Sequence, residues 1–263
     1  MFASRGSSRT RWKHTVAGCL GLGLSLVLAA AAGAVPIVIN DGFYAGPTAS
    51  GSGAASQTSD VIGRYADFDI RSITFTQVAS DAVTASIRFN YHGGDASLAD
   101  WSLAGSTMRV GDLLFGAGGG YQYGVALVSH DGLDAGDLYA ITGTRSSDSY
   151  LAGSGLYWRF GTPVRMQSAG ATWLGGGTSS TTNLGGYEVE TTLTFAPGGN
   201  FLAALMAAGA LDVHFASAIC ANDIIDGSLP RPVPEVGSLL LVGSGLLVGG
   251  LVLGRLRLRR PKP

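Results

Sequence analysis

Lysine is almost absent from this chain, and its absence from the middle sets the charge of that part. Lysine occurs only at Lys13 and Lys262, near the two ends. Residues 35–230 therefore have only seven arginines to balance seventeen acidic residues, which leaves a formal net charge of −10. Because so acidic a domain repels phosphate backbones, the composition argues against nucleic acid as a partner.

Cysteine is also scarce, with one residue at Cys19 and one at Cys220. Cys19 stands at the start of an apolar run, whereas a lipoprotein cleavage box places its cysteine at the end, so no lipoprotein is predicted. We expect Cys19 to be removed with that run, which leaves no pair for an intramolecular disulfide. A domain of this length buries enough core without one, and Cys220 is interpreted as a small buried hydrophobe. A reactive or intermolecular thiol is the alternative.

The N-terminus has the three parts of a secretory signal peptide. The basic part comes first and consists of Arg5, Arg9, Arg11 and Lys13. Residues 16–32 are then apolar or small throughout, and Ala32 and Ala34 form an A-x-A cleavage site. Residues 1–34 are therefore predicted to be a signal peptide that is cut after Ala34, with a retained membrane helix as the alternative.

Near the C-terminus, residues 236–254 form an uncharged run that predicts a transmembrane helix. At a rise of about 1.5 Å per residue, this run nearly spans a hydrocarbon core of about 30 Å. A basic tip follows at once and includes Arg255, Arg257, Arg259 and Arg260. The positive-inside rule keeps this tip, like the basic N-terminus, on the cytoplasmic side. Residues 35–230 are therefore expected on the far side of the membrane.

The stretch Val233-Pro234-Glu235-Val236, followed by the apolar run and the arginine cluster, resembles a PEP-CTERM sorting signal. Residues 231–263 are assigned to this signal, and Val236 stands where the pattern has a second proline. The resemblance implies a Gram-negative bacterium that makes exopolysaccharide, and cleavage near the motif by an exosortase, a membrane-embedded transpeptidase-like enzyme. It also implies an anchor in the inner membrane until processing, and then release to the outer surface or extracellular matrix. Exosortase and exopolysaccharide are the partners that follow from it.

Between the two ends, apolar residues alternate with polar ones in the manner of β-strands. Residues 73–76 and 83–91 predict a hairpin around the turn Ser80-Asp81, and residues 187–195 show the most regular alternation. Further strands are expected at 108–115, 123–128, 137–142, 156–160, 164–167 and 211–215. Short strands separated by Gly, Ser and Asp turns favour an all-β domain at 35–230, an antiparallel β-sandwich of jelly-roll-like form.

A few segments of this domain break the β pattern. Asn200 is predicted to cap one short helix at 201–208, which ends at Gly209. Residues 35–60 are rich in Gly, Ala, Ser and Thr and are expected to be loosely structured. Residues 228–234 contain three prolines and are predicted to be a linker to the membrane segment.

Short motifs along residues 38–230 are similar to those of a recurring exported β-domain that carries the same sorting signal. They include Asp41-Gly42-Phe43-Tyr44 near the start and Cys220-Ala221-Asn222-Asp223 near the end. Ala221 stands where that family more often has glycine. The resemblance implies no established reaction.

Two groups of acidic residues are the candidates for chemistry. Glu188 and Glu190 share one face of a predicted strand, about 7 Å apart, and paired carboxylates of this kind hydrolyse glycosidic bonds in some enzymes. The competing interpretation places them on a solvated polar face. Asp131, Asp134 and Asp137 lie in a Gly-containing loop of the type that binds calcium, but their spacing does not match an EF-hand. Ordinary Asp-Gly turns are the alternative, and no resident cofactor is predicted.

Imidazole and aromatic side chains give weaker evidence. The histidines at His92, His130 and His214 are scattered and lack the spacing of a metal site. Three tryptophans offer rings on which sugars stack, or pack in the core, namely Trp101, Trp158 and Trp173. The sequence therefore favours a non-catalytic, exported component of the cell envelope or extracellular matrix. A glycan-binding module and a secreted glycan hydrolase are the alternatives.

Overall fold

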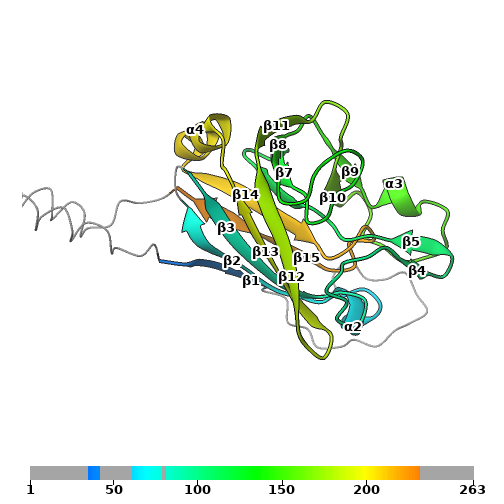
Figure 1. Ribbon diagram of the computed structural model, residues 1–263. Helices are drawn as coiled ribbons and strands as arrows, with labels where there is room; N and C mark the ends of the chain where they lie inside the picture. The colour runs from blue at the N-terminus through cyan, green and yellow to red at the C-terminus, as the bar shows by residue number, and fades with distance from the viewer. Residues whose placement is uncertain (1–34, 42–60, 79–80, 232–263) are drawn as a thin grey trace, which may run out of the picture. The chain divides into compact units, whose positions relative to one another are not determined.

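The computed structural model describes residues 35–41, 61–78 and 81–231, and these form mostly β-strands (Figure 1). Every pairing between named strands in these ranges is antiparallel. Helices are few and short, the longest being ten residues. The prediction of an all-β, antiparallel domain is therefore confirmed.

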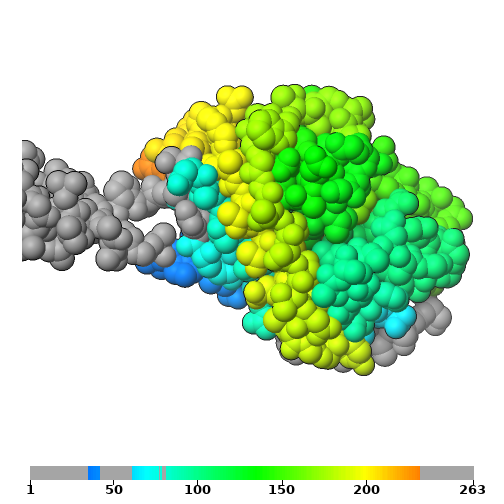
Figure 2. All heavy atoms as spheres, viewed as in Figure 1, coloured from blue at the N-terminus to red at the C-terminus, as the bar shows by residue number. Residues whose placement is uncertain are grey.

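One large sheet has five strands in the order β1-β2-β3-β13-β12. Their bounds are Ile37–Asn40 for β1, Ile70–Val78 for β2, Val83–Asn90 for β3, Glu188–Phe195 for β13 and Gly177–Gly185 for β12. The predicted hairpin is β2–β3, and the most regular alternation is β13, whose residues are buried at every second position. Figure 2 shows β12 on the surface, in yellow-green, as a band across the molecule.

The other large sheet has six strands in the order β11-β8-β7-β6-β14-β15. Their bounds are Thr172–Gly175 for β11, Leu138–Ala140 for β8, Tyr121–Val125 for β7, Leu113–Gly116 for β6, Ala210–Ala216 for β14 and Ile224–Pro230 for β15. Two further sheets have two strands each. They are β4 (Trp101–Leu103) with β5 (Ser106–Met108), and β9 (Thr144–Ser146) with β10 (Pro163–Met166).

A single large core receives side chains from both large sheets. Phe115 of β6 lies at its centre, with ring centroids 6.2 Å from Phe75 of β2 and 6.0 Å from Phe195 of β13. Phe201 of α4 (Gly199–Ala208) closes the group at 5.3 Å from Phe115. Because period-2 alternation puts one face of each strand in this core, the apolar faces of the two sheets share the same interior.

The predicted helix is α4, and its end is confirmed at Gly209, which adopts a left-handed φ of 77°. Its start was wrongly predicted, because Gly198 rather than Asn200 occupies the N-cap and no side chain caps the helix. Two four-residue helices, α2 (Tyr65–Phe68) and α3 (Asp148–Leu151), were missed. They are too short to show a helical period in the sequence.

Several strand predictions were wrong in extent. Residues 156–160 form no strand, because Asp148 accepts hydrogen bonds from Trp158 Nε1 and the Gly161 N–H and holds the segment as a loop. Residues 108–115 are interrupted between β5 and β6. β1 lies inside the region expected to be loose, and the first three residues of the predicted linker belong to β15.

The chain leaves β15 beside α4, where the Arg231 N–H donates to the Gly209 carbonyl at 2.9 Å. The predicted signal peptide with Ala32 and Ala34, the predicted sorting motif, the run 236–254 and the arginine tip all fall outside the residues that the structure describes. Within the described ranges, no helix has both the length and the apolar character needed to cross a membrane.

Candidate functional site

The site with the most unusual chemistry is a hollow of about 300 Å³ beside β9 and β10, which we call the Arg165 hollow. Its lining residues come from the loops before β4, after β5 and after β7, from β9 and β10, and from α3. They are Asp100, Arg109, Val128, Ser129, His130, Asp131, Arg145, Tyr150 and Arg165. Three of the seven arginines of residues 35–230 therefore meet at one hollow of an otherwise acidic domain.

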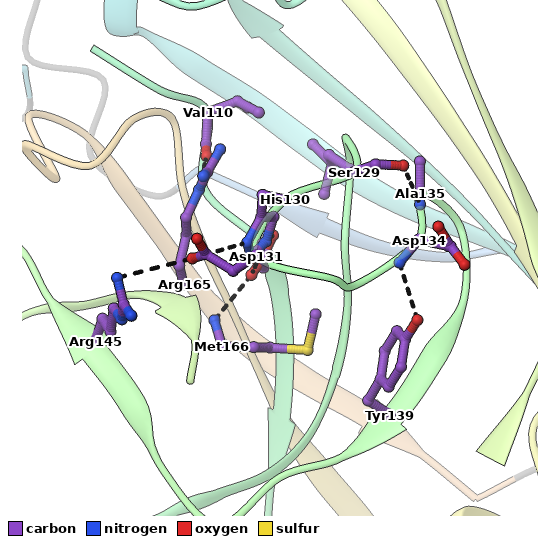
Figure 3. A network of polar contacts seen from close by, with 12 residues as sticks. Val110, Ser129, His130, Asp131, Asp134, Ala135, Tyr139, Arg145, Arg165 and Met166 are labelled. Carbon is purple, nitrogen blue, oxygen red and sulfur yellow. Dashed lines mark hydrogen bonds and ion pairs between the residues drawn. The ribbon is translucent and has the colours of Figure 1, made fainter. Parts of the chain in front are cut away.

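Arg165 forms the buried part of this hollow. It lies on β10 with 3% of its surface exposed, and its Nε donates to the Val110 carbonyl at 2.7 Å (Figure 3). Among the described residues, no carboxylate forms an ion pair with it, and its two terminal nitrogens make no hydrogen bond. These nitrogens are not sealed from solvent, so they open on the hollow. A buried guanidinium without a counter-ion is costly, which sets this position apart from an ordinary surface arginine.

His130 is fixed next to Arg165 by a fully buried carboxylate. Its Nε2 lies 3.0 Å from both oxygens of Asp112, which also accepts from the Met166 N–H at 2.8 Å. Because a carboxylate accepts, Nε2 carries a proton. The other ring nitrogen, Nδ1, is buried without a hydrogen bond, and its nearest charged neighbour is Asp131 Oδ2 at 3.5 Å.

Tyr150 and Arg145 form the outer wall. The Tyr150 hydroxyl is buried and makes no hydrogen bond with a described residue, and the Arg145 guanidinium lies 6.0 Å from the ring centroid. Burial raises the pKa of Tyr150, while the nearby Arg165 and Arg145 pull it down. Arg145 faces Asp131 at 3.7 Å, and both side chains are more than two-fifths exposed (Figure 3). The rim of the hollow therefore contains a solvent-exposed ion pair, Arg145 with Asp131, whose atoms are not in close contact.

The three loop aspartates predicted as calcium candidates are not brought together. Asp131 lies at the rim of the Arg165 hollow. The two oxygens of Asp137 are occupied, because Oδ2 accepts from Trp173 Nε1 at 2.9 Å and Oδ1 from the Gly177 N–H at 2.8 Å. The Asp134 N–H donates to the Tyr139 hydroxyl, which fixes the turn. Within the described part of the chain, no group of three His, Cys, Asp or Glu residues could hold a metal ion.

Glu188 and Glu190 lie on the face of β13 that points away from the core, and both pair with Arg88 of β3. The distances are 2.8 Å from Arg88 Nη2 to Glu188 and 4.0 Å from Arg88 Nε to Glu190. Neither glutamate lines the Arg165 hollow. Their contacts are those of a cross-strand charge pair on a sheet surface.

The three tryptophans differ in exposure. Trp101 is 8% exposed and stacks on His92, with ring centroids 4.4 Å apart. Trp158 is partly buried and packs against the core. Trp173 is 58% exposed, and its indole N–H is held by Asp137. Among the three, Trp173 alone presents most of its ring to solvent.

A second hollow, of about 350 Å³, lies against β14 and β15 and is acidic, with Asp212 and Asp226 in its lining. His214, expected on a polar face of its strand, is instead 2% exposed. It is enclosed because Nδ1 lies 2.6 Å from Asp226 Oδ1 and Nε2 lies 2.8 Å from the Pro163 carbonyl. These contacts join β10 to the six-stranded sheet.

Cys220 is 1% exposed, and burial raises the pKa of its thiol to about 12. The thiol therefore stays protonated in the folded chain and is a poor nucleophile or metal ligand. This environment matches the interpretation of Cys220 as a buried hydrophobe.

No protein-family model matches the chain, and no curated protein or solved structure matches it either. The function of the chain is therefore inferred from its own residues. Sequence reasoning missed Arg165, Tyr150 and Asp112. The one available signal was an arginine between two apolar residues in Val164-Arg165-Met166, which a surface strand of period two also produces.

Proposed function

We propose that the chain is an exported, non-catalytic component of the bacterial cell envelope or extracellular matrix, with residues 35–230 as a jelly-roll-like β-sandwich. The observation that carries this proposal is the separation of charge along the chain. A lysine-free body with a formal net charge of −10 lies between two ends that are basic and apolar. The basic residues of such ends stay on the cytoplasmic side during export, whereas the acidic body crosses the membrane.

The sorting part of the proposal depends on Val233, Pro234, Glu235 and Val236, which resemble a PEP-CTERM motif. An exosortase of a Gram-negative inner membrane would read this motif together with the run 236–254 and the arginine tip. Before cleavage, the run holds the protein at the inner membrane. After cleavage, the body moves to the outer surface or the matrix, where exopolysaccharide is the candidate partner.

Intact-mass analysis of the exported protein tests this proposal, in a host that carries the exosortase. We expect the wild-type chain to lose both the signal peptide and the tail with Arg255–Arg260. Glu235→Ala should leave the tail attached, because the substitution removes the only charge of the motif. Glu190→Ala, the same change outside the motif, serves as the control and should be processed normally. A wild-type exported chain that still carries the tail would overturn the proposal.

Binding of neutral glycans is the second candidate function, and the exposed ring of Trp173 favours it. Sugar rings stack on such indoles, and the hydrogen bond to Asp137 holds this ring in one orientation. We expect Trp173→Ala to abolish any signal of the full-length protein on a glycan array. Tyr187→Ala, at another exposed aromatic residue, should leave the signal unchanged. Hydrolysis at Glu188 and Glu190 has no comparable support, because both are engaged by Arg88.

A further inference from the structure

The unbalanced charge of the Arg165 hollow lies at its buried part and not at its rim. Arg109 pairs with Asp100 at 2.9 Å, and Arg145 faces Asp131 at 3.7 Å, so each rim arginine has a carboxylate. Arg165 has none among the described residues. Asp112 is a buried carboxylate near Arg165, but its oxygens already contact His130 Nε2 and accept from the Met166 N–H. The hollow therefore contains one guanidinium that forms no ion pair with a described carboxylate.

Two polar atoms near Arg165 have charged neighbours but no good hydrogen bond: Asp131 Oδ2 lies 3.5 Å from His130 Nδ1, and Arg145 lies beside the Tyr150 ring. The Tyr150 hydroxyl and His130 Nδ1 both belong to side chains that line the hollow, and neither makes a hydrogen bond with a described residue. Because Nε2 is engaged by Asp112, Nδ1 is the ring nitrogen of His130 that a ligand could contact. Unpaired polar atoms in a buried position are rare and usually indicate a missing partner. Here an anionic group would suit Arg165, and a hydroxyl, which both donates and accepts, would suit His130 Nδ1 and Tyr150.

We propose that the Arg165 hollow binds a small hydroxylated oxyanion, such as a sugar acid or sugar phosphate, with the oxyanion against Arg165. Guanidinium groups bind carboxylate and phosphate oxygens through charge-assisted hydrogen bonds. A volume of about 300 Å³ lies at the lower end of the range for small-molecule pockets, so the ligand is of monosaccharide size. The Arg145–Asp131 pair at the rim is 3.7 Å apart and solvated, so a ligand that enters the hollow can compete with Asp131 for Arg145.

This site goes beyond the proposed sorting function and is independent of it, because no residue of the hollow lies in the terminal segments. It also differs from the glycan surface at Trp173, which would take uncharged sugars. The acidity of the surrounding domain disfavours large polyanions, whereas a single small anion enters a locally positive hollow.

Calorimetric titration of the full-length protein in detergent tests the inference with three probes. Glucuronate carries a carboxylate, glucose 6-phosphate carries a phosphate, and glucose carries neither. We expect at least one of the two anions to bind and to raise the melting temperature progressively with the logarithm of its concentration, and glucose to do neither. Which anion binds more tightly identifies the preferred oxyanion.

Variants then locate the binding. Arg165→Gln should abolish it, and Arg145→Gln and Tyr150→Phe should each weaken it by about tenfold, the usual loss for one charged or buried hydrogen bond. Arg88→Gln removes the same charge from the outer face of the five-stranded sheet and should bind like the wild type. Arg145→Gln and Tyr150→Phe keep the test valid if Arg165→Gln does not fold. Failure of both anions to bind, or equal binding by Arg145→Gln, Tyr150→Phe and the wild type, would overturn the proposal.

Discussion

Two aspartates around α2 show how burial changes a side chain that the sequence presents as ordinary. Asp67 and Asp69 are 1% exposed, and each pairs with an arginine at 2.9 Å, Arg64 for the first and Arg71 for the second. Desolvation nevertheless outweighs these pairs. It raises the pKa of Asp69 to about 6 and also raises the pKa of Asp67. Both carboxylates therefore hold a proton more tightly in the folded chain than in the unfolded one.

This shift predicts a stability that falls as the pH rises through the weakly acidic range. The unfolded chain releases the Asp69 proton near pH 4, but the folded chain releases it near pH 6. Between these values the folded state binds more protons, so the free energy of unfolding decreases with pH and stays lower above pH 6. Asp69→Asn should remove roughly 1–3 kcal/mol of this decrease. Guanidinium unfolding at pH 4, 5, 6 and 7 measures it.

Asp81→Asn is the matched control, because Asp81 is exposed in the β2–β3 turn. It should leave the pH profile of the wild type unchanged. An Asp69→Asn profile that coincides with the wild-type profile between pH 4 and 6 would show that Asp69 titrates normally.

Single residues of the Arg165 hollow could not be predicted from the sequence. Asp112 lay inside the predicted strand 108–115 and Arg165 inside the predicted strand 164–167, so neither stood out as a site residue. His130 appeared isolated because its partner, Asp112, is eighteen residues away in the sequence. The function of each residue depends on contacts between segments, and local spacing does not encode these contacts.

At the scale of elements, alternation of apolar and polar residues was a sufficient signal for β2, β3 and β13. It failed for β12, whose sequence GTSSTTNLG contains almost no apolar residue. β12 lies at the edge of its sheet and is held by hydroxyl contacts, such as Thr181 to Thr191 at 2.9 Å and Ser179 Oγ to the Leu127 carbonyl at 2.7 Å. Such a strand has no buried apolar face and therefore no alternation in its sequence. It forms because β13 offers an edge with which it can pair.

Gly136 lies in the loop before β8 and packs closely against the backbone of β12. We expect this contact to be sensitive to substitution. Its φ is 85°, and a Cβ at this position would lie 2.4 to 2.6 Å from the backbone of Thr178. Gly136→Ala should therefore destabilise the protein by about 2 kcal/mol or more, because backbone cannot move aside as a flexible side chain does. Chemical denaturation gives the change.

Gly132 provides the control for that substitution. Its φ of 84° is nearly the same, but a Cβ there would meet nothing within 4 Å. Gly132→Ala should cost only the left-handed backbone strain, about 1 kcal/mol. Equal losses for the two variants would show that the contact with Thr178 yields easily.

For the whole molecule, the sequence was sufficient for the fold class but not for the arrangement of the sheets. β3 pairs with β13 across about a hundred residues of intervening chain, with Arg88 opposite Glu190. The sequence of neither strand identifies the other as its partner, since many alternating strands have compatible apolar faces. Hydrophobic patterning determines that strands form and which face is buried, and the complete set of side chains in the core selects the partners.

The charge separation gives the sorting experiment a second readout at this scale. The complete chain has a pI of about 6.4, because its basic ends offset the acidic body. Removal of both ends leaves the acidic body, in which seventeen acidic residues outnumber seven arginines. Isoelectric focusing of the processed protein should therefore give a band below about pH 5. A band that stays near the pI of the complete chain would agree with an uncut tail.

The hydrogen bond between the Arg231 N–H and the Gly209 carbonyl limits the room around the sorting motif. Only four peptide units separate Arg231 from Glu235, a reach of at most about 14 Å. An enzyme that cuts beside Glu235 after the body has folded therefore has to approach within about 14 Å of the end of β15 and α4. It needs either a shallow active site at the membrane surface or a substrate whose last strand has not yet joined its sheet. Under the proposed sorting function, the end of β15 would thus act as a spacer that couples the order of folding and cleavage.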